Sequence, residues 1–324
     1  MSLFRSVIAA ALLLCTALLT GPSARAADNV SVGTVGSASA NLWPVFIGIK
    51  KGFFSGADLN VDIIYVQSSA ALVQQLAAGS LDITMSTGLV DPIRAIDQNA
   101  GISIVRFEAQ APPYVLMAKP AIKMLSDLKG KVISLGGPKD ITRIYVERML
   151  APHGVKPGEF DMVFAGATAA RAQALLGGAV DAAILLPPFN FQAEAQGFNN
   201  LGLTVEYAPE LPFSGTVVNK AWAASHQDIL KRMLAAHTKA VEWFYDDKNR
   251  DEAITILTSV SSLKPDDVAK SYDFFRKNAF FERTGAISRK KMTALIDALT
   301  SLGDVQAKGN IERFVMPAVT QISD

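Results

Sequence analysis

The chain contains an internal repeat, and this repeat constrains the fold more than any other feature. Residues 69–82 align with residues 168–181, at an offset of about 99 positions. In each copy a hydroxyl residue, Ser69 or Thr168, stands where a helix N-cap is wanted, and good helix formers follow it. Glycine falls where the helix should end in a left-handed residue, and the apolar residues after the shared aspartate are typical of a buried strand. The identities are Ala70, Ala71, Gln74, Leu76, Gly79 and Asp82, which recur as Ala169, Ala170, Gln173, Leu175, Gly178 and Asp181.

The similarity continues upstream of these helices. Residues 61–66 correspond to residues 160–165, and residues 30–35 correspond to residues 131–135; all are short apolar segments. Each copy is therefore predicted to run strand, helix, strand, helix, strand, an alternation that produces a parallel-rich sheet with helices on both faces. Chance similarity between two alanine-rich helices is the alternative, but it does not account for the matched strands. We therefore expect two α/β lobes with a cleft between them.

Two extended segments, residues 112–118 and 211–218, are predicted to connect the lobes. The first leaves the first copy, and the second returns from the second copy. We expect residues 27–112 and 217–324 to form lobe 1 and residues 113–216 to form lobe 2. Apolar residues at helical spacing beyond the second connection predict long helices that pack on lobe 1, among them Leu230, Leu234, Val241, Phe244, Met292, Leu295, Ile296 and Leu299.

The first 26 residues are predicted to be a cleaved signal peptide. Arg5 gives a basic start, residues 7–19 form a short apolar run, and Ala24-Arg25-Ala26 matches an A-x-A cleavage site. A transmembrane anchor is the alternative, but it needs about twenty apolar residues. Cleavage would remove Cys15, the only cysteine, so the exported protein would have neither a disulfide nor a thiol. These features predict a periplasmic protein.

Composition and motifs argue against several other classes of protein. The formal net charge of +1 argues against nucleic acid or an anionic membrane as the main partner. His153 follows a helix near its C-cap, and His226 and His237 fall in a predicted polar helical region. No histidine has a partner at metal-ligand spacing, and the chain has no G-x-S-x-G motif. We expect no metal, no cofactor and no enzymatic activity.

Five segments of the chain are informative about its family: residues 43–54, 76–83, 127–133, 175–182 and 243–247. In these segments the chain resembles the periplasmic solute-binding proteins of ABC importers, in the broad group for nitrate, sulfonates, taurine and thiamine-pyrimidine precursors. The resemblance implies the type II periplasmic-binding-protein fold, with two lobes that close on a small molecule and two hinge strands that join them. It also implies an inner-membrane permease with its ATPase as partner, and we expect a monomer. The related pyrimidine synthases of thiamine biosynthesis share this fold, but their cysteine- and histidine-rich site is missing here.

Ligand-binding residues are expected in the loops beyond the carboxyl ends of the strands, where the two lobes face each other. Several of these loops lead into helices, so free backbone N–H groups and the positive end of the helix dipole favour an anionic head group. The predicted residues are Ser37, Ser39, Asn41, Trp43, Ser68, Ser69, Thr87, Gly88, Tyr114, Asp140, Thr142, Thr168, Pro188, Phe189 and Phe213.

Some of these residues have a purely structural alternative. Ser69, Thr168 and Asp140 could act only as helix caps. Trp43 and Phe189 could hold a flat ligand between them or could pack in the core. Two arginines, Arg143 and Arg171, could pair with a carboxylate or sulfonate. For Arg171 an exposed helix face is expected, because Leu72 takes its place in the first copy.

These observations predict capture of a small organic anion, a sulfonate or carboxylate with or without an aromatic body, for delivery to a permease. A neutral heterocycle such as a pyrimidine precursor is the alternative ligand. Ligand sensing through a membrane receptor is the alternative role. Both roles require only that the ligand stabilise the closed state, so both stay open.

Overall fold

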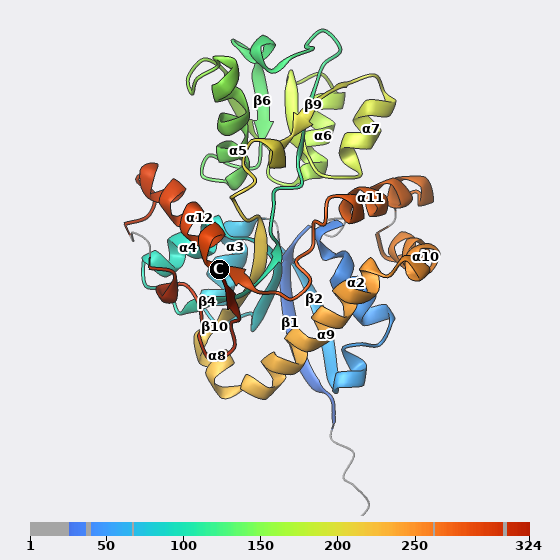
Figure 1. The fold of residues 1–324 in the computed structure, drawn as a ribbon, viewed down its shortest axis with the longest axis vertical. Helices are drawn as coiled ribbons and strands as arrows, with labels where there is room; N and C mark the ends of the chain where they lie inside the picture. Colours follow the sequence, from blue (N-terminus) through green and yellow to red (C-terminus); the bar gives the residue numbers. More distant parts are fainter. Residues whose placement is uncertain (1–25, 37–39, 67, 262, 307–309) are drawn as a thin grey trace, which may run out of the picture.

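The structure is a computed structural model that describes residues 26–36, 40–66, 68–261, 263–306 and 310–324. All but the last residue of the predicted signal peptide lies outside these ranges. Two lobes, each built on a five-stranded sheet, lie one above the other, and the chain passes between them twice (Figure 1). No helix in the described part of the chain is both long enough and apolar enough to cross a membrane.

The sheet of lobe 1 has the strand order β2-β1-β3-β10-β4. β1 pairs in parallel with β2 and β3, whereas β10 lies antiparallel between β3 and β4. All eight residues of β4 are buried, because the sheet is covered on both faces. The strands are β1 Asp28–Val35, β2 Leu59–Val66, β3 Ile83–Gly88, β4 Ile102–Ala109 and β10 Ser214–Asn219.

The sheet of lobe 2 repeats this arrangement, with the order β7-β6-β8-β5-β9. β6 pairs in parallel with β7 and β8, and β5 lies antiparallel between β8 and β9. The predicted repeat is therefore confirmed, since both sheets are parallel-rich with one antiparallel strand in the fourth position. The strands are β5 Val115–Ala118, β6 Val132–Leu135, β7 Asp161–Phe164, β8 Ala182–Leu185 and β9 Asn199–Leu203.

The helices of the two copies also correspond. Lobe 1 has α2 Trp43–Lys50, α3 Ser69–Ala77 and α4 Val90–Asp97, and lobe 2 has α5 Ile141–Leu150, α6 Thr168–Leu176 and α7 Phe189–Ala195. α3 and α6 both lead into a left-handed glycine as predicted, with φ values of 76° at Gly79 and 78° at Gly178. Short 3-10 helices lie at Ala40–Leu42, Ser55–Ala57, Leu125–Leu128, Ala151–His153, Thr204–Glu206, Asp247–Asn249 and Ile311–Arg313.

The expected caps of α3 and α6 are wrong by one residue. Ser68, not Ser69, caps α3, and its side chain accepts a hydrogen bond from the backbone N–H of Ala71 at 3.2 Å. The corresponding position before α6 is Ala167, which has no side-chain acceptor, so this helix has no side-chain cap. Thr168 is instead the first residue of α6, and its hydroxyl is free to bond elsewhere.

The two connections between the lobes are tied to each other. Thr204 donates its hydroxyl to the carbonyl of Pro112 at 3.1 Å and accepts from the backbone N–H of Tyr114 at 3.2 Å. The ring of Tyr114 meets that of Phe213 edge to face, with 5.3 Å between the centroids. Because β10 begins at Ser214 in the lobe 1 sheet, the second connection ends before that residue.

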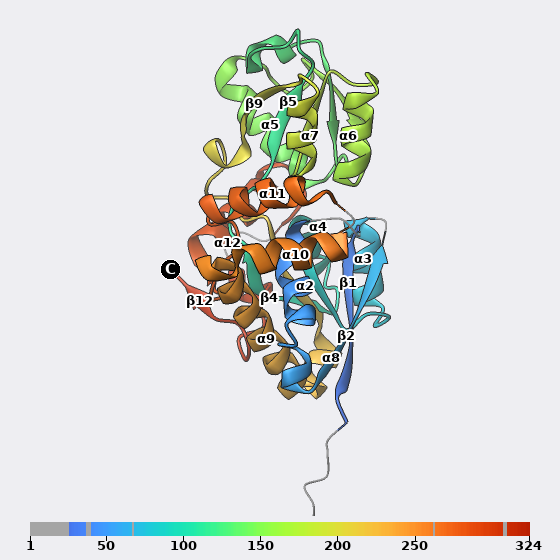
Figure 2. The ribbon, with the colours of Figure 1, turned by 90° about the vertical axis from the view of Figure 1, so that its right-hand side faces the viewer.

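The C-terminal helices mostly cover lobe 1, as expected, but one of them also reaches lobe 2. α9 packs on α2, and α12 packs on α4. α11 lies between the lobes (Figure 2), where Phe274 contacts Phe191 of α7 with 6.0 Å between the ring centroids. The side chain of Gln192 also donates to Asp267 at 2.9 Å. The elements are α8 Lys220–Ser225, α9 Gln227–Tyr245, α10 Arg250–Ser261, α11 Pro265–Lys277, α12 Arg289–Ser301, β11 Ile287–Ser288 and β12 Ile322–Ser323.

His237 departs from the prediction of a polar helical region. α9 is amphipathic, and its buried face carries this histidine together with residues such as Leu230 and Phe244. Only 1% of His237 is exposed, and neither ring nitrogen has a hydrogen-bond partner among the described residues. Burial, reinforced by the nearby Arg106, lowers the pKa of His237 well below its usual value.

Candidate ligand-binding site

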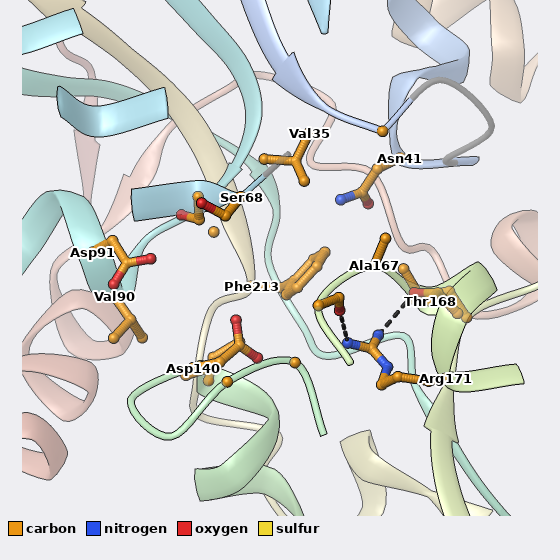
Figure 3. A pocket seen from close by; sticks show the side chains of 18 of the residues that line it. Val35, Asn41, Ser68, Val90, Asp91, Asp140, Ala167, Thr168, Arg171 and Phe213 are labelled. Carbon is orange, nitrogen blue, oxygen red and sulfur yellow. Dashed lines mark hydrogen bonds between the residues drawn. The ribbon is translucent and has the colours of Figure 1, made fainter. Parts of the chain in front are cut away.

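A cavity of ≈ 690 Å³ lies between the two lobes (Figure 3). Its size falls within the range of about 300–1,000 Å³ that is usual for small-molecule sites. The wall comes from both lobes, at the carboxyl ends of the parallel strands and the first turns of the helices that follow. The predicted residues that line it are Asn41, Ser68, Ser69, Gly88, Tyr114, Asp140, Thr168, Phe189 and Phe213.

Two helix N-termini face this cavity from opposite lobes. Ser69 and Ala70 begin α3, Thr168 and Ala169 begin α6, and all four residues line the wall. None of their backbone N–H groups donates a hydrogen bond to any residue that the structure describes. Because the repeat places these free donors at equivalent positions, the cavity has two matched partial positive charges.

Arg171 adds a full positive charge to the lobe 2 wall. Its Nε donates to the carbonyl of Ile184 at 2.9 Å, Nη1 to the carbonyl of Gly166 at 2.6 Å, and Nη2 to the hydroxyl of Thr168 at 2.8 Å. It forms no ion pair with a carboxylate in the described part of the chain. These three bonds use three of the five N–H groups of the guanidinium and fix its position.

The expected exposed position of Arg171 is wrong, because the residue is only 3% exposed. Its counterpart in the first copy, Leu72, is also fully buried, so this helix position faces inward in both lobes. The guanidinium carbon lies 5.6 Å from the centre of the Tyr114 ring. Burial raises the pKa of the Tyr114 hydroxyl, and the charge of Arg171 partly opposes this effect.

Two carboxyl groups line the same cavity from different lobes. Asp91 stands in the first turn of α4, and Asp140 caps α5 by accepting from the backbone N–H of Thr142 at 2.9 Å. The expected capping role of Asp140 is therefore confirmed, although the residue also lines the cavity. Burial is the main cause of a raised pKa at Asp91, and Asp140 raises it further, whereas Ser69 and Arg94 oppose the shift.

Gly136 separates the Asp140 carboxylate from the Arg171 guanidinium. A Cβ at this position would lie 2.7 Å from Oδ1 of Asp140 and 3.0 Å from Nη1 of Arg171, so only glycine fits here. The backbone N–H of Gly136 donates to the hydroxyl of Thr142 at 2.9 Å. Thr142 is therefore buried beneath the loop and positions it, and the residue does not line the cavity.

Asn41 presents its side-chain amide to the cavity from lobe 1. The residue is 7% exposed, its side chain points into the cavity (Figure 3), and that side chain bonds to no described residue. The carbonyl of Asn41 lies 2.7 Å from the hydroxyl of Ser86, whose φ of 56° is left-handed. The buried Glu108 holds Ser86 in place by accepting its backbone N–H at 2.7 Å. Burial raises the pKa of Glu108, and its hydrogen bonds oppose that shift.

The remaining predicted residues do not line the cavity. Trp43 is fully buried and meets Phe275 edge to face, with 5.6 Å between the ring centroids, so the core alternative describes its position. Thr87 and Pro188 are buried behind the wall. Ser37 and Ser39 lie outside the described residues.

Arg143 also stays away from the main cavity. It pairs with Glu147 at 2.7 Å and donates to the carbonyl of Pro138 at 3.2 Å. It lines a smaller cavity of ≈ 380 Å³, together with Arg94 and Asp304. Within the described ranges, no three His, Cys, Asp or Glu side chains are grouped closely enough to hold a metal ion.

Several solved structures are similar to this chain. An alkanesulfonate-binding protein, SsuA from Xanthomonas axonopodis pv. citri bound to MOPS, has 16% identity and a TM-score of 0.73, covering 91% of this chain and 98% of that one. The ligand-binding component of an ABC-type import system from Staphylococcus aureus has 15% identity and a TM-score of 0.75, covering 90% and 97%. The desulfurization enzyme DszB has 12% identity and a TM-score of 0.65, covering 89% and 96%.

These likenesses show the periplasmic-binding-protein fold that the sequence predicts. No curated protein sequence matches the chain at a significant level. A family model described as NMT1/THI5 like matches residues 39–250, which is more than half of the chain. The protein therefore belongs to the NMT1/THI5-like family.

Proposed function

We propose that the protein is the periplasmic solute-binding component of an ABC importer, and that it captures a small organic anion between its lobes. Arg171 carries this proposal. It is a buried cation without an ionic partner among the described residues, and it lines the cavity. A buried charge is costly unless an opposite charge compensates it, so a carboxylate or sulfonate on the ligand is the expected partner.

The cavity provides the rest of an anion site. The free N–H groups at the starts of α3 and α6 face the cavity from both lobes, and the helix dipoles favour negative charge there. Because three acceptors hold the Arg171 guanidinium, little conformational entropy is lost when an anion binds. The rings of Tyr114, Phe213 and Phe189 form an apolar wall for an organic body, aromatic or aliphatic.

We also propose that the two lobes, with all of β10 (Ser214–Asn219) belonging to lobe 1, move as rigid bodies about the two connections. A ligand held by α3 and α6 contacts both lobes, so it stabilises the closed state over the open one. The closed form then docks as a monomer on an inner-membrane permease with its ATPase. This role requires no catalytic group. Two neighbours of this fold support it, since one binds alkanesulfonates and the other belongs to an ABC-type import system.

Thermal unfolding of residues 27–324 against a panel of solutes tests the ligand class. The panel holds alkyl and aryl sulfonates, aliphatic and aromatic carboxylates, nitrate and pyrimidines. A ligand at a hundred times its Kd adds about 2.7 kcal/mol to the free energy of unfolding of the protein. The melting temperature of the protein should therefore rise by a few degrees. Arg171→Gln should abolish the rise. Arg148→Gln should preserve it, because Arg148 is half exposed and pairs with Glu210.

Stabilisation by pyrimidines alone would contradict the anion proposal. A flat panel, with no ligand co-purifying in native mass spectrometry, would contradict the solute-binding role itself. Import is tested by reconstituting the permease with its ATPase, where the ligand-bound protein should stimulate ATP hydrolysis. If the bound protein stimulates no hydrolysis, the sensing alternative replaces import.

A further inference from the structure

The cavity is polarised from one side to the other. Asp91 and Asp140 lie on one side, and Arg171 and Thr168 lie on the opposite side, with the Phe213 ring between them (Figure 3). Carboxylate oxygens accept hydrogen bonds and carry negative charge, whereas the guanidinium and the helix start donate. A ligand that carries only an anion uses one of these two sides.

The negative side is only partly neutralised by the protein. Arg94 donates to one oxygen of Asp91 at 3.2 Å, and the same guanidinium pairs more closely with Asp304, at 2.6 Å. Asp304 also pairs with Lys139 at 3.4 Å. Asp140 uses one oxygen, Oδ1, to cap its own helix, and no described residue bonds to the other oxygen. Asp91 therefore shares its cation with Asp304, and Asp140 forms no ion pair in the described part of the chain.

The two carboxyl groups come from different lobes, so lobe closure brings them together. Asp91 belongs to α4 of lobe 1, and Asp140 precedes α5 of lobe 2. Their interaction is unfavourable in this arrangement, since the charge of Asp140 raises the pKa of Asp91. A cation or an N–H donor between them would remove this repulsion and so would favour the closed state.

A second, independent observation shows that the cavity is built for a polar ligand. Asn41 is 7% exposed as a residue, its side chain points into the cavity, and no described residue bonds to its amide. A ligand that shields this amide from water must supply its hydrogen bonds. An amide both donates and accepts, so it is suited to a ligand that carries both kinds of polar group.

We propose, on the basis of the solute-binding role above, that the ligand is amphoteric: its acid group lies at Arg171, and a protonated amine or another N–H donor lies between Asp91 and Asp140. The organic body that joins the two groups lies across Phe213. Asp91 and Asp140 are then specificity residues, because they select ligands that carry the nitrogen. Arg171 selects for the acid group.

Matched pairs of ligands test this proposal by titration calorimetry on residues 27–324. Each pair differs only in the amine: 3-aminopropanesulfonate against propanesulfonate, 4-(aminomethyl)benzoate against 4-methylbenzoate, and ω-amino acids of two to five carbons against the corresponding fatty acids. The amine should improve Kd by at least about tenfold in the pairs that fit, as expected for a charge-assisted hydrogen bond.

The variants separate the two sides of the cavity. Asp91→Asn should remove the advantage of the amine over the plain acid, because the variant lacks the charge that would pair with the amine. Asp140→Asn should act in the same direction and still cap α5, since asparagine is also a good N-cap. Asp161→Asn is the matched control, because Asp161 is exposed on the edge strand β7. Thermal unfolding verifies that each variant is folded.

The outcomes distinguish the two proposals. If plain acids bind as well as or better than their amine partners, or if Asp91→Asn keeps the preference, the amphoteric ligand is refuted and the solute-binding role stands. If no member of any pair binds, and the wider panel is also flat, both proposals fail.

Discussion

The buried His237 makes the stability of the protein depend on pH in a defined direction. Its imidazole is 1% exposed and has no hydrogen-bond partner among the described residues. Arg106 lies beside it, and Glu108 and Glu282 act in turn on Arg106. Burial and the arginine charge hold the pKa of His237 well below the ordinary value of 6.5, so the folded protein keeps this ring neutral in mild acid. The unfolded chain takes up a proton there as the pH falls below that value. The stability that depends on this group is therefore lost on acidification.

The size of the loss follows from proton linkage. Between pH 7.5 and 5.5 a histidine that titrates at 6.5 only in the unfolded state removes about 1.4 kcal/mol from the free energy of unfolding. Replacing His237 by Leu abolishes this loss, because leucine binds no proton in either state. The unfolding free energy of His237→Leu minus that of the natural protein should therefore increase by about 1.4 kcal/mol when the pH is lowered from 7.5 to 5.5.

Urea unfolding of residues 27–324 at pH 7.5, 6.5 and 5.5 measures this difference. His226→Gln is the matched control, because His226 is exposed at the start of α9 and lacks the burial on which the prediction for His237 depends. A difference for His237→Leu that does not change with pH would refute the reasoning. It would mean that the folded protein accommodates the protonated ring beside Arg106.

Four further substitutions test packing and capping. Trp43→Ala should lower the free energy of unfolding by about 3–5 kcal/mol, because this fully buried ring packs on Phe275, and it should leave Kd nearly unchanged. Phe189→Ala should instead raise Kd and cause a much smaller loss of stability. Urea unfolding measures the stability of both aromatic variants, and calorimetry measures their Kd. A large loss of stability in Phe189→Ala would assign Phe189 to the core. Ser68→Ala should cost about 1 kcal/mol in the same assay, because Ser68 caps α3. Ser69→Ala removes no cap, and equal losses for the two serines would contradict the assignment.

The repeat made most of the fold predictable. Strand and helix periodicities are local properties, so the alternation in each copy correctly indicated two parallel-rich sheets. The same alignment also indicated where each helix would end, at Gly79 and Gly178. It did not reveal that each sheet has an antiparallel strand, because that strand enters from the connection between the lobes and lies outside the repeated unit.

The candidate site was predictable only in outline. The loops at the carboxyl ends of the strands do meet in one cavity, since topology alone places them there. Arg171 was expected on an exposed helix face because Leu72 takes its place in the first copy. This reasoning was wrong, because leucine is usually buried, so the equivalence with Leu72 indicated a position that faces inward. Side-chain direction explains Trp43, because the first turn of α2 turns this residue toward α11 and away from the cleft.

Other parts of the site could not be found from the sequence at all. Asp91 and Asp140 belong to different lobes and are brought together only in the folded protein. Glu108 lies in the fully buried strand β4, where a carboxylate is not expected. The cost of burying this carboxylate is offset by hydrogen bonds from Ser86 and Thr216, which are both distant from Glu108 in the chain. Such partners depend on tertiary structure, and no local sequence pattern predicts them.

The position of β10 has a consequence for the order in which the chain can complete its two halves. All five strands of the lobe 2 sheet lie within one continuous stretch, from Val115 to Leu203. The lobe 1 sheet begins at Asp28, but the gap between β3 and β4 stays open until residues 214–219 are available to fill it. A chain that emerges from a ribosome or a translocation channel with its N-terminus first can therefore finish the second sheet before the first. Lobe 1, although its first strands are synthesised earliest, keeps unpaired edges on β3 and β4 until β10 has been synthesised after lobe 2.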